Sequence, residues 1–426
     1  MQTQEPIVEM PTVLTRPEVA PESWRAAVQP WWKATLTVLP TFLLTRFIFL
    51  ILSYFGGVLF FVPNYWPGQL DFHQVLYTWY HWDAVRYATI ATSGYITEDY
   101  AAFFPLYPAL ERVVSMFFHQ DILVTGMILS NRAFLGTMIV FYRFVEIEFE
   151  SETAKRSVLY LSIFPTALFF FAAYNESLFL FFMLLCFYAL RQGSWWLAGL
   201  FGGLATLTRS IGLFLFVIFL CEYGRQMLPR LQQVRQSKQL VHVIRFFSGL
   251  PASLLIPLGL GLYAYALSIR FGDPLAFSNA QVHWREGLSP PWVGPIIALK
   301  SIVHLSPYTF AVPHNIIELT ALGLFLLLLM LSFVGPERFK RNQWTFALFG
   351  FMALTYALLF PGSPSPNNIP YDPLPSMQRF VLEIFAGFIV LARYGRRPWF
   401  HQSYLLLALP MLAFLVFQFM TGHWTI

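Results

Sequence analysis

The stretch "HWDAVRYATIATSGY", from His81 to Tyr95, brings together a carboxylate, an arginine and several aromatic side chains, in a chain with only 12% charged residues. If it forms a helix, Asp83, Arg86 and Tyr87 share one face, since side chains three and four residues apart are neighbours there. A positioned carboxylate can accept a proton from a hydroxyl group, and a guanidinium can bind phosphate oxygens through two parallel hydrogen bonds. Taken alone, a Trp-Asp pair is more often part of an aromatic belt with a surface ion pair.

Other charged side chains lie within or beside apolar stretches. They are Arg46, Arg132, Glu176, Arg209, and Arg379 with Glu383. An ionised side chain at membrane depth is costly unless it is paired or hydrated, so such residues usually face a bundle interior or a water-filled cleft. A structural ion pair explains each one about as well as a functional role does. Most of them, however, are expected at the same end of the bundle as residues 81–99, and this convergence favours a functional site.

The composition indicates the environment in which this chemistry takes place. Of the 426 residues, 57% are hydrophobic and 46 are phenylalanine, more than a soluble core requires. The apolar runs are too long and continuous for barrel strands, so we expect a polytopic α-helical membrane protein. The net charge of +5 is better explained by loop residues than by a nucleic-acid partner. Cys186 and Cys221 lie in apolar runs and are expected to be free thiols.

The elements that must position these side chains are apolar runs. They lie near residues 34–62, 122–142, 157–174, 176–191, 195–223, 246–270, 315–335, 343–360, 379–394 and 402–421. The run 195–223 has Arg209 near its middle, followed by Ser210 and Gly212. As a single span, it would place the next basic loop on the side opposite the other basic loops. Two short helices that meet around Thr208–Gly212 restore the alternation, and the sequence then predicts a bundle of eleven transmembrane helices.

The distribution of positive charge predicts the orientation of this bundle. With a cytoplasmic amino terminus, 18 of the 27 basic residues fall in cytoplasmic loops, as the positive-inside rule requires. They are Arg16, Arg25, Lys33, Arg143, Lys155, Arg156, Arg191, Arg225, Arg230, Arg235, Lys238, Arg245, Arg338, Lys340, Arg341, Arg393, Arg396 and Arg397. Residues 1–33 are expected to be a disordered cytoplasmic tail and 34–426 a single transmembrane domain. The outer side receives three sizeable loops, at 63–121, 271–314 and 361–378.

The residue types in these outer loops restrict the reactions that a site there could catalyse. No metal-ligand spacing appears among the nine histidines, and there is no glycine-rich phosphate loop. What remains is a carboxylate surrounded by arginines and aromatic rings. A single carboxylate suffices for glycosyl transfer from a phospholipid, because phosphate leaves without a proton and only the acceptor hydroxyl needs a general base. A glycosidase needs a second carboxyl group, because its leaving group is an alcohol.

The motifs resemble those of a known family. The order "HWDAVRY", "IATSGY", Glu98 and "FFPLYP" resembles the signature of the second GPI mannosyltransferase family, the PIG-V family. The segments "AAYNESLF", "ATLTRSIGL" and "QRFVLEIFAGFIVLA" resemble its later motifs, and the resemblance extends from about residue 40 to residue 395. The first motif is the most specific. Ile211 stands where the eukaryotic pattern usually has Asn, so the sequence looks like a prokaryotic relative.

This resemblance implies a GT-C glycosyltransferase with a helical first extracytoplasmic loop, which inverts the anomeric centre at the outer face of a bacterial plasma membrane. It implies transfer of a sugar, expected to be mannose, from a polyprenyl-phosphate donor to a lipid-linked or other extracytoplasmic acceptor. Asp83 is then the expected general base. The expected substrate-binding residues are Trp82, Arg86, Glu98, Glu176, Arg209 and Arg379. The expected partners are this donor, a lipid or glycan acceptor and membrane lipids; no metal ligand is assigned, and a divalent metal requirement stays open.

A transporter or flippase of a lipid-linked glycan is the alternative from a different functional class. It would explain the number of spans and the arginines within them. Transporters usually show inverted repeats and helices broken at the membrane midplane, whereas this sequence shows one break and no repeat. A non-catalytic assembly partner is a weaker third interpretation.

Overall fold

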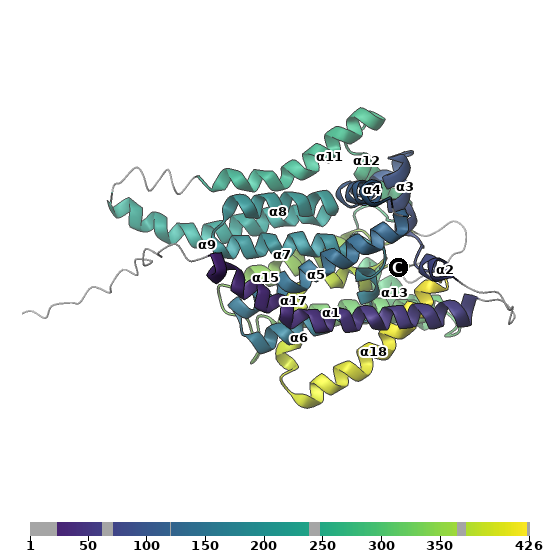
Figure 1. Cartoon of the computed structure of the whole chain (residues 1–426). Helices are drawn as coiled ribbons and strands as arrows, with labels where there is room; N and C mark the ends of the chain where they lie inside the picture. The colour runs from purple at the N-terminus through teal and green to yellow at the C-terminus, as the bar shows by residue number, and fades with distance from the viewer. Residues whose placement is uncertain (1–23, 62–70, 120, 238–247, 364–371, 424–426) are drawn as a thin grey trace, which may run out of the picture.

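The computed structural model describes residues 24–61, 71–119, 121–237, 248–363 and 372–423. Long helices run alongside one another, and short helices gather at one end of this bundle (Figure 1). These described residues include no extended strand, and one isolated antiparallel bridge joins Arg285 to Gly362. The all-helical class predicted from the sequence is therefore confirmed.

The bundle consists of the longer helices and the 3-10 turns between them. In chain order they are α1 (Trp24–Phe61), α5 (Ile122–Glu148), α6 (Ser151–Ser162), η3 (Ala167–Phe170), α7 (Glu176–Gln192), α8 (Trp195–Thr208), η4 (Ser210–Leu213), α9 (Phe214–Ser237), η5 (Leu250–Leu254), α11 (Leu255–Phe271), α14 (Ala311–Leu331), α15 (Trp344–Leu359), α16 (Met377–Phe380), η7 (Val381–Glu383), α17 (Phe385–Tyr394) and α18 (Pro398–Met420). The outer loops add α2 (Phe72–Tyr77), α3 (Asp83–Ser93), η2 (Glu98–Ala102), α4 (Leu106–Phe118), α12 (Ala276–Asn279), η6 (Ala280–His283) and α13 (Val293–His304).

Six of the described helices are long and apolar enough to cross a membrane. They are Val28–Phe60, Ile122–Glu148, Ser210–Leu228, Leu250–Phe271, Ala311–Leu331 and Pro398–Met420. Only 22% of the apolar window in the first of them is buried within the bundle, so most of its side chains face outward, as expected for a helix in contact with lipid. Every apolar run predicted from the sequence contains helix, but the number of eleven crossings stays a prediction.

The first helix begins earlier than expected. The sequence predicts a disordered tail up to residue 33, whereas α1 starts at Trp24; residues 1–23 lie outside the described residues. The Trp31 ring packs on Tyr188 of α7, with ring centroids 5.1 Å apart, and the Arg143 guanidinium lies 5.9 Å from the same indole. These contacts give the start of the helix a packing surface that composition alone does not indicate.

The predicted hairpin between residues 195 and 223 is present. Helix α8 ends at Thr208, Arg209 is extended (φ −153°, ψ 144°), and the chain returns through η4 into α9. Trp195, at the start of α8, packs on Tyr223 in α9, with ring centroids 4.7 Å apart. A Cβ atom on Gly212 would lie 2.5 Å from the backbone nitrogen of Thr206, so the reversal requires glycine at this position. Arg209 therefore lies at the tip of a helical hairpin.

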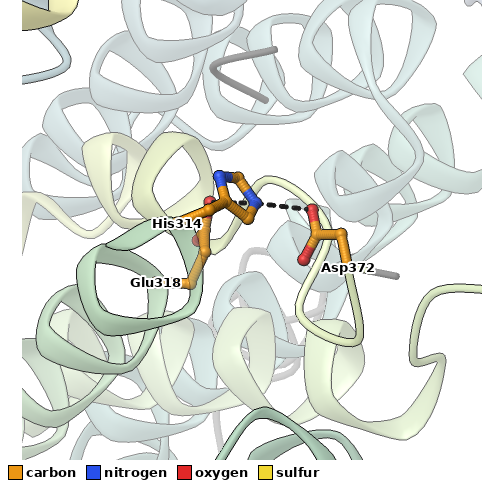
Figure 2. A group of neighbouring side chains, drawn as sticks. All are labelled: His314, Glu318 and Asp372. Carbon is orange, nitrogen blue, oxygen red and sulfur yellow. Dashed lines mark ion pairs between the residues drawn. The ribbon is translucent and has the colours of Figure 1, made fainter. Parts of the chain in front are cut away.

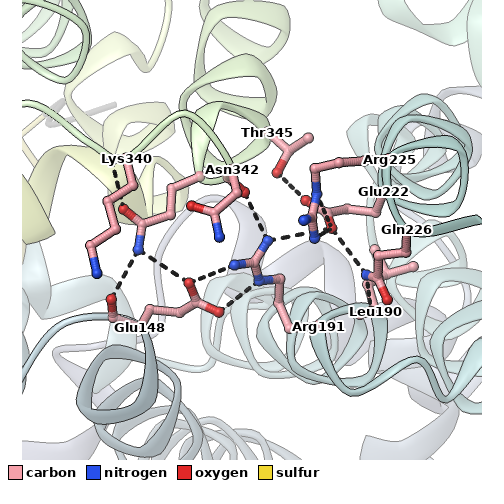
Figure 3. A network of polar contacts seen from close by, with 10 residues as sticks. Glu148, Leu190, Arg191, Glu222, Arg225, Gln226, Lys340, Asn342 and Thr345 are labelled. Carbon is pink, nitrogen blue, oxygen red and sulfur yellow. Dashed lines mark hydrogen bonds and ion pairs between the residues drawn. The ribbon is translucent and has the colours of Figure 1, made fainter. Parts of the chain in front are cut away.

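One end of the bundle is held by a cluster of ion pairs (Figure 3). Arg191, near the end of α7, donates to both carboxylate oxygens of Glu148 (2.6 and 2.8 Å) and to the carbonyl oxygen of Asn342 (2.8 Å). Glu222 of α9 is fully buried and accepts a hydrogen bond of 2.5 Å from Thr345 Oγ1. The ends of α5 and α7 and the start of α15 therefore meet here, where the sequence predicts the cytoplasmic side.

The outer loops come together at the opposite end (Figure 1). Tyr263 of α11 donates a hydrogen bond of 2.9 Å to the carbonyl oxygen of Ala101 in the first outer loop. The backbone nitrogen of Ser363 donates to the carbonyl oxygen of Trp284 (3.0 Å), next to the bridge between Arg285 and Gly362. The rings of Phe103 in the first outer loop and Trp284 in the second lie 5.9 Å apart between centroids, so the three predicted outer loops are joined around one end of the helices.

Candidate active site

Asp83 is the first residue of α3, and the residue before it has an unusual backbone conformation. Trp82 has φ 48° and ψ −112°, which side chains larger than glycine rarely adopt. Such a conformation costs about 1–3 kcal/mol and persists only where the surroundings impose it. The Trp82 ring packs on Phe419 of α18 (centroids 5.1 Å apart), and His81 Nε2 donates to the carbonyl oxygen of Met420 (3.2 Å). Helix α18 therefore holds the turn that directs Asp83.

A chain of ion pairs leads from Asp83 into the bundle. Arg379 Nη1 lies 2.6 Å from Asp83 Oδ2, and Arg379 Nε donates to Glu176 Oε1. The same Glu176 oxygen accepts a hydrogen bond of 2.5 Å from Arg209 Nη1, and Arg209 Nε lies 2.9 Å from Glu383 Oε1. These residues come from α3, α16, the start of α7, the hairpin tip and η7. The fold thus joins four residues that the sequence singled out as site residues, together with Glu383.

The three carboxylates in this series of ion pairs differ in their access to solvent. The Asp83 side chain is 24% exposed, whereas those of Glu176 and Glu383 are 0% and 1% exposed. The Arg379 guanidinium lies 4.8 Å from the centroid of the Tyr174 ring, an arrangement that favours a cation in a desolvated site. A reacting hydroxyl group can therefore approach Asp83 but not the two inner carboxylates.

The start of α7 explains how Glu176 is positioned. Asn175 Nδ2 donates to the carbonyl oxygen of Thr208 (2.9 Å), and Asn175 Oδ1 accepts from Arg209 Nη1 (3.3 Å). One amide side chain thus fastens the amino terminus of α7 to the hairpin tip. Glu176 and Asp83 are both first residues of helices, where the helix dipole stabilises negative charge.

Arg86 and Glu98, which the sequence also predicts to bind substrate, line a separate cavity of about 460 Å³. Its other lining residues are Asp99, His283 and Trp284, so the cavity lies between the first and second outer loops. Arg86 Nη1 lies 2.6 Å from Asp99 Oδ2. An indole ring, a histidine and two carboxylates are side chains that can contact the ring and the hydroxyl groups of a sugar.

The charge of Asp99 keeps Arg86 at the wall of this cavity. Partial burial alone would raise the pKa of Asp99, but the hydrogen bond from Thr97 and the Arg86 guanidinium outweigh it and hold the pKa below its ordinary value. Asp99 is therefore ionised at neutral pH. The Arg86 guanidinium also lies 4.6 Å from the centroid of the Tyr100 ring, which fixes it further.

Sequence reasoning did not indicate Arg285, a further cation beside the ion pairs. Its guanidinium lies 5.2 Å from the centroid of the Phe380 ring, and the Arg209 guanidinium lies equally far from the same centroid. Arg285 Nη1 donates to the carbonyl oxygen of Phe360 (2.9 Å), and within the described part of the chain no carboxylate forms an ion pair with it. The second outer loop has no local motif, and its backbone contacts with residues 359–363, which include the bridge to Gly362, bring Arg285 here.

Two of the six charged residues singled out in the sequence, both arginines, lie outside the series of ion pairs. Arg46 Nη1 donates to Asn131 Oδ1 (2.8 Å) and to the carbonyl oxygen of Phe170 (3.1 Å), and its guanidinium is surrounded by aromatic rings. Arg132 is exposed on α5. Among the described residues, neither forms an ion pair with the carboxylates that hold Arg209 and Arg379. The aromatic rings and carbonyl oxygens around Arg46 stabilise it without a counter-ion.

The fold also assembles a group that could hold a metal ion. His314 and Glu318 of α14 lie beside Asp372 of the third outer loop (Figure 2), with one potential ligand atom of each within 4.8 Å of the others. The sequence did not indicate this group, because its third member comes from a segment more than fifty residues away. The spacing of His314 and Glu318, four residues apart on one helix, was the only local signal.

Comparison with solved structures finds matches at low sequence identity. ArnT from Cupriavidus metallidurans bound to undecaprenyl phosphate is 13% identical, with a TM-score of 0.46, and the match covers 85% of this chain and 62% of that one. The oligosaccharyltransferase of Archaeoglobus fulgidus in the apo form is 10% identical, with a TM-score of 0.42, and the match covers 90% of this chain and 56% of that one. This chain thus spans about three fifths of the length of these proteins.

A search of curated proteins finds no match. The model of the family described as mannosyltransferase (PIG-V), in contrast, matches residues 57–292, which is more than half of the 426 residues. The matched region includes the turn before α3, the start of α7 and the hairpin tip, and so three of the four predicted residues that the ion pairs join. The chain belongs to the mannosyltransferase (PIG-V) family.

Proposed function

We propose that the protein is an integral membrane glycosyltransferase of the GT-C type, which transfers mannose from a polyprenyl-phosphate donor to a lipid-linked or other extracytoplasmic acceptor. Family membership supports the reaction class. The observation that carries the proposal is the position of Asp83, the solvent-accessible end of a chain of ion pairs that otherwise lies inside the bundle.

The donor phosphate would bind among the arginines at this end. Arg379 and Arg209 are already paired with carboxylates, whereas Arg285 donates only to a backbone carbonyl oxygen in the described structure. A phosphate has the geometry to accept hydrogen bonds from such guanidinium groups. When it binds, it would compete with Asp83 for Nη1 of Arg379, and the Asp83 carboxylate would then be free to accept a proton.

The reaction would be a displacement at the anomeric carbon of the sugar. The acceptor hydroxyl oxygen forms the new bond to this carbon, and the bond to the phosphate oxygen breaks with its electron pair moving to the phosphate. The hydroxyl proton passes to Asp83, and the configuration is inverted because the oxygen enters opposite the leaving phosphate. Trp82 would hold Asp83 in position through its packing on Phe419.

The acceptor would occupy the cavity lined by Arg86, Glu98, Asp99, His283 and Trp284. Asp83 and Arg86 lie on the same short helix, three residues apart, so the two parts of the site are neighbours. Glu98 is the carboxylate placed to orient an acceptor hydroxyl group, while Trp284 offers an aromatic face to a sugar ring.

The test is turnover of polyprenyl-phosphate mannose by purified protein in proteoliposomes, with a lipid extract of the host membranes as the source of acceptor. Release of polyprenyl phosphate is measured. Asp83→Asn keeps the size of the side chain but removes its basicity, so turnover should fall by roughly 10²–10⁴-fold. Glu98→Gln should have a milder effect. Asp71→Asn is the control, because Asp71 lies in the same loop and caps the exposed helix α2.

Two results would contradict this assignment. Near-normal turnover by Asp83→Asn together with complete loss in Glu98→Gln would make Glu98 the base. A wild-type protein that releases no polyprenyl phosphate, but moves a labelled lipid-linked glycan across the bilayer, would be a transporter or flippase.

A further inference from the structure

A histidine and a glutamate of α14 lie beside an aspartate of the third outer loop (Figure 2). His314 Nε2 lies 3.0 Å from Asp372 Oδ2 and 3.8 Å from Glu318 Oε1. The side chains of His314 and Glu318 are 4% and 0% exposed, and that of Asp372 is 11% exposed. The group is therefore almost completely removed from solvent.

The three converging atoms are held in place but lack hydrogen bonds. Glu318 Oε2 accepts from the backbone nitrogen of Gln378 (2.7 Å), and Asp372 Oδ1 accepts from the backbone nitrogen of Leu374 (3.1 Å). Each carboxylate thus uses one oxygen for the backbone and directs the other toward the histidine. Among the described residues, Glu318 Oε1 is buried without a hydrogen-bond partner, and the buried atoms His314 Nε2 and Asp372 Oδ2 have only their ion pair with each other, which lacks hydrogen-bond geometry. Buried polar atoms seldom remain unpaired, so this geometry indicates a missing partner.

The charge of the group also indicates a cation. Two ionised carboxylates buried so close together repel each other, and their removal from water is costly unless a cation or a bound proton compensates. A doubly charged cation would neutralise both of them and would leave the histidine neutral, as a metal ligand must be. A proton on His314 would neutralise only one of the two.

We propose that His314, Glu318 and Asp372 bind a divalent transition-metal ion, with Zn²⁺ as the best match to the ligand types. One imidazole nitrogen and two carboxylate oxygens suit zinc, whereas Ca²⁺ and Mg²⁺ prefer sites built from oxygen ligands. Bonds from these ligands to zinc are about 2.0–2.2 Å long, which places the ligand atoms of a tetrahedral site roughly 3.3–3.6 Å apart. The three atoms here lie within 4.8 Å of one another, so side-chain shifts on the order of 1 Å close the site. The three protein ligands leave a fourth position for water.

The ion would hold the segment that carries Arg379. Asp372 precedes Arg379 by seven residues, and Glu318 is hydrogen-bonded to the residue directly before it, Gln378. A metal ion between α14 and this segment would therefore fix the start of α16, from which Arg379 reaches Asp83. The three ligands are positioning residues in this proposal, and the metal takes no part in the transfer step.

The first measurement is the metal content of the wild-type protein, purified through a tag without histidine and analysed by elemental mass spectrometry. We expect about one zinc ion per chain. In His314→Gln and in Asp372→Asn the affinity for zinc should fall by at least roughly 10-fold, the loss that even indirect disturbance of a metal site produces. His304→Gln is the matched control, because His304 is exposed at the end of α13 and belongs to the same side of the molecule.

Two further readouts do not depend on transfer activity or on the folding of the variants. Cobalt added to chelator-treated wild-type protein should give the visible absorption of a four- or five-coordinate site, and added zinc should abolish it. Zinc should also raise the melting temperature of the chelator-treated protein. The proposal is overturned if wild-type protein contains no metal and its melting temperature does not respond to zinc. It is equally overturned if His314→Gln and Asp372→Asn retain as much metal as His304→Gln.

Discussion

Trp82 has a backbone conformation that a large side chain normally avoids, and the next residue is the exposed end of a chain of buried ion pairs. The two facts are connected, because a relaxed turn would start α3 in a different direction and move Asp83 away from Arg379. The strain is compensated by the contacts of Trp82 with Phe419 and of His81 with Met420. A glycine at position 82 would relieve the strain but would also lose this packing.

At the scale of one residue, a substitution of Arg209 tests whether its guanidinium binds the donor phosphate. Arg209→Lys keeps the positive charge beside Glu176 and Glu383 but loses the guanidinium fork. A hydrogen bond to a charged group contributes about 1.5–3 kcal/mol, which corresponds to roughly a 10- to 150-fold loss in donor use. The measurement is the dependence of turnover on donor concentration, with thermal unfolding recorded in parallel.

Arg191→Lys is the matched control, since Arg191 also binds a carboxylate through two nitrogens but lies at the opposite end of the bundle. It should lower stability without changing donor use. If Arg209→Leu folded and turned over the donor normally, Arg209 would have only a structural role.

At the scale of the elements, the hairpin between α8 and α9 decides where Arg209 lies. A single helix through residues 195–223 would carry this arginine at membrane depth, whereas the reversal brings it to the end where α3 and α16 meet. The reversal depends on the close approach of η4 to the last turn of α8, where Gly212 faces the backbone of Ala205 and Thr206.

Gly212→Ala tests this element. The added Cβ would meet backbone atoms at 2.5–2.7 Å, and backbone cannot move aside as a flexible side chain does. We expect a loss of stability of about 1–3 kcal/mol, as for other overpacked sites, together with a loss of donor turnover because Arg209 is displaced. Thermal unfolding in detergent and the turnover assay measure the two effects.

Gly261→Ala is the control for this substitution, because Gly261 lies within α11 with open space around its Cβ position. Alanine is the better helix former, so this variant should be as stable as wild type or slightly more stable. Equal behaviour of the two variants would show that the hairpin does not depend on close packing at Gly212.

At the scale of the whole molecule, the two ends of the bundle contain different sets of ion pairs. The end with the outer loops contains the ion pairs of Asp83, Arg379 and Arg209, whereas the other end is held by pairs such as Arg191 with Glu148 and Arg396 with Glu150. This second set lies in or beside loops to which the sequence assigns most of its positive charge. The positive-inside rule then predicts that the end with Asp83 lies on the extracytoplasmic side.

Cysteine labelling in intact cells tests this orientation. In a background with Cys221→Ser, a cysteine in place of the exposed Ser93 should react with a membrane-impermeant thiol reagent added outside. A cysteine in place of the exposed Asn342 should react only after the membrane is permeabilised. The native Cys186 is buried and should stay unreactive in both proteins. Labelling of both positions from the same side of intact cells would rule out the predicted topology.

The sequence by itself determined the helical membrane class, the family and the identity of the residues in the ion-pair chain. These properties are local: hydropathy and helical periodicity are read over windows of about 20 residues, and the Trp-Asp and Asn-Glu motifs are contiguous. The hairpin was also predictable, because an arginine and a glycine within an apolar run disfavour a single span. The start of α1 was not, since it depends on the packing of Trp31 on a distant helix.

Only the tertiary structure decided which of the charged residues form the ion pairs, which line the cavity and which lie elsewhere. It pairs Asp83 with Arg379 across 296 positions of sequence, places Arg86 and Glu98 in a neighbouring cavity, and leaves Arg46 among aromatic rings. It also adds Arg285 and the group of His314, Glu318 and Asp372, for which the sequence shows no contiguous motif. The physical reason is that the order of residues along a helix fixes only which of them share its face. Which faces of different helices and loops meet is settled by the packing of the whole bundle, and the partners of a buried charge follow from that packing.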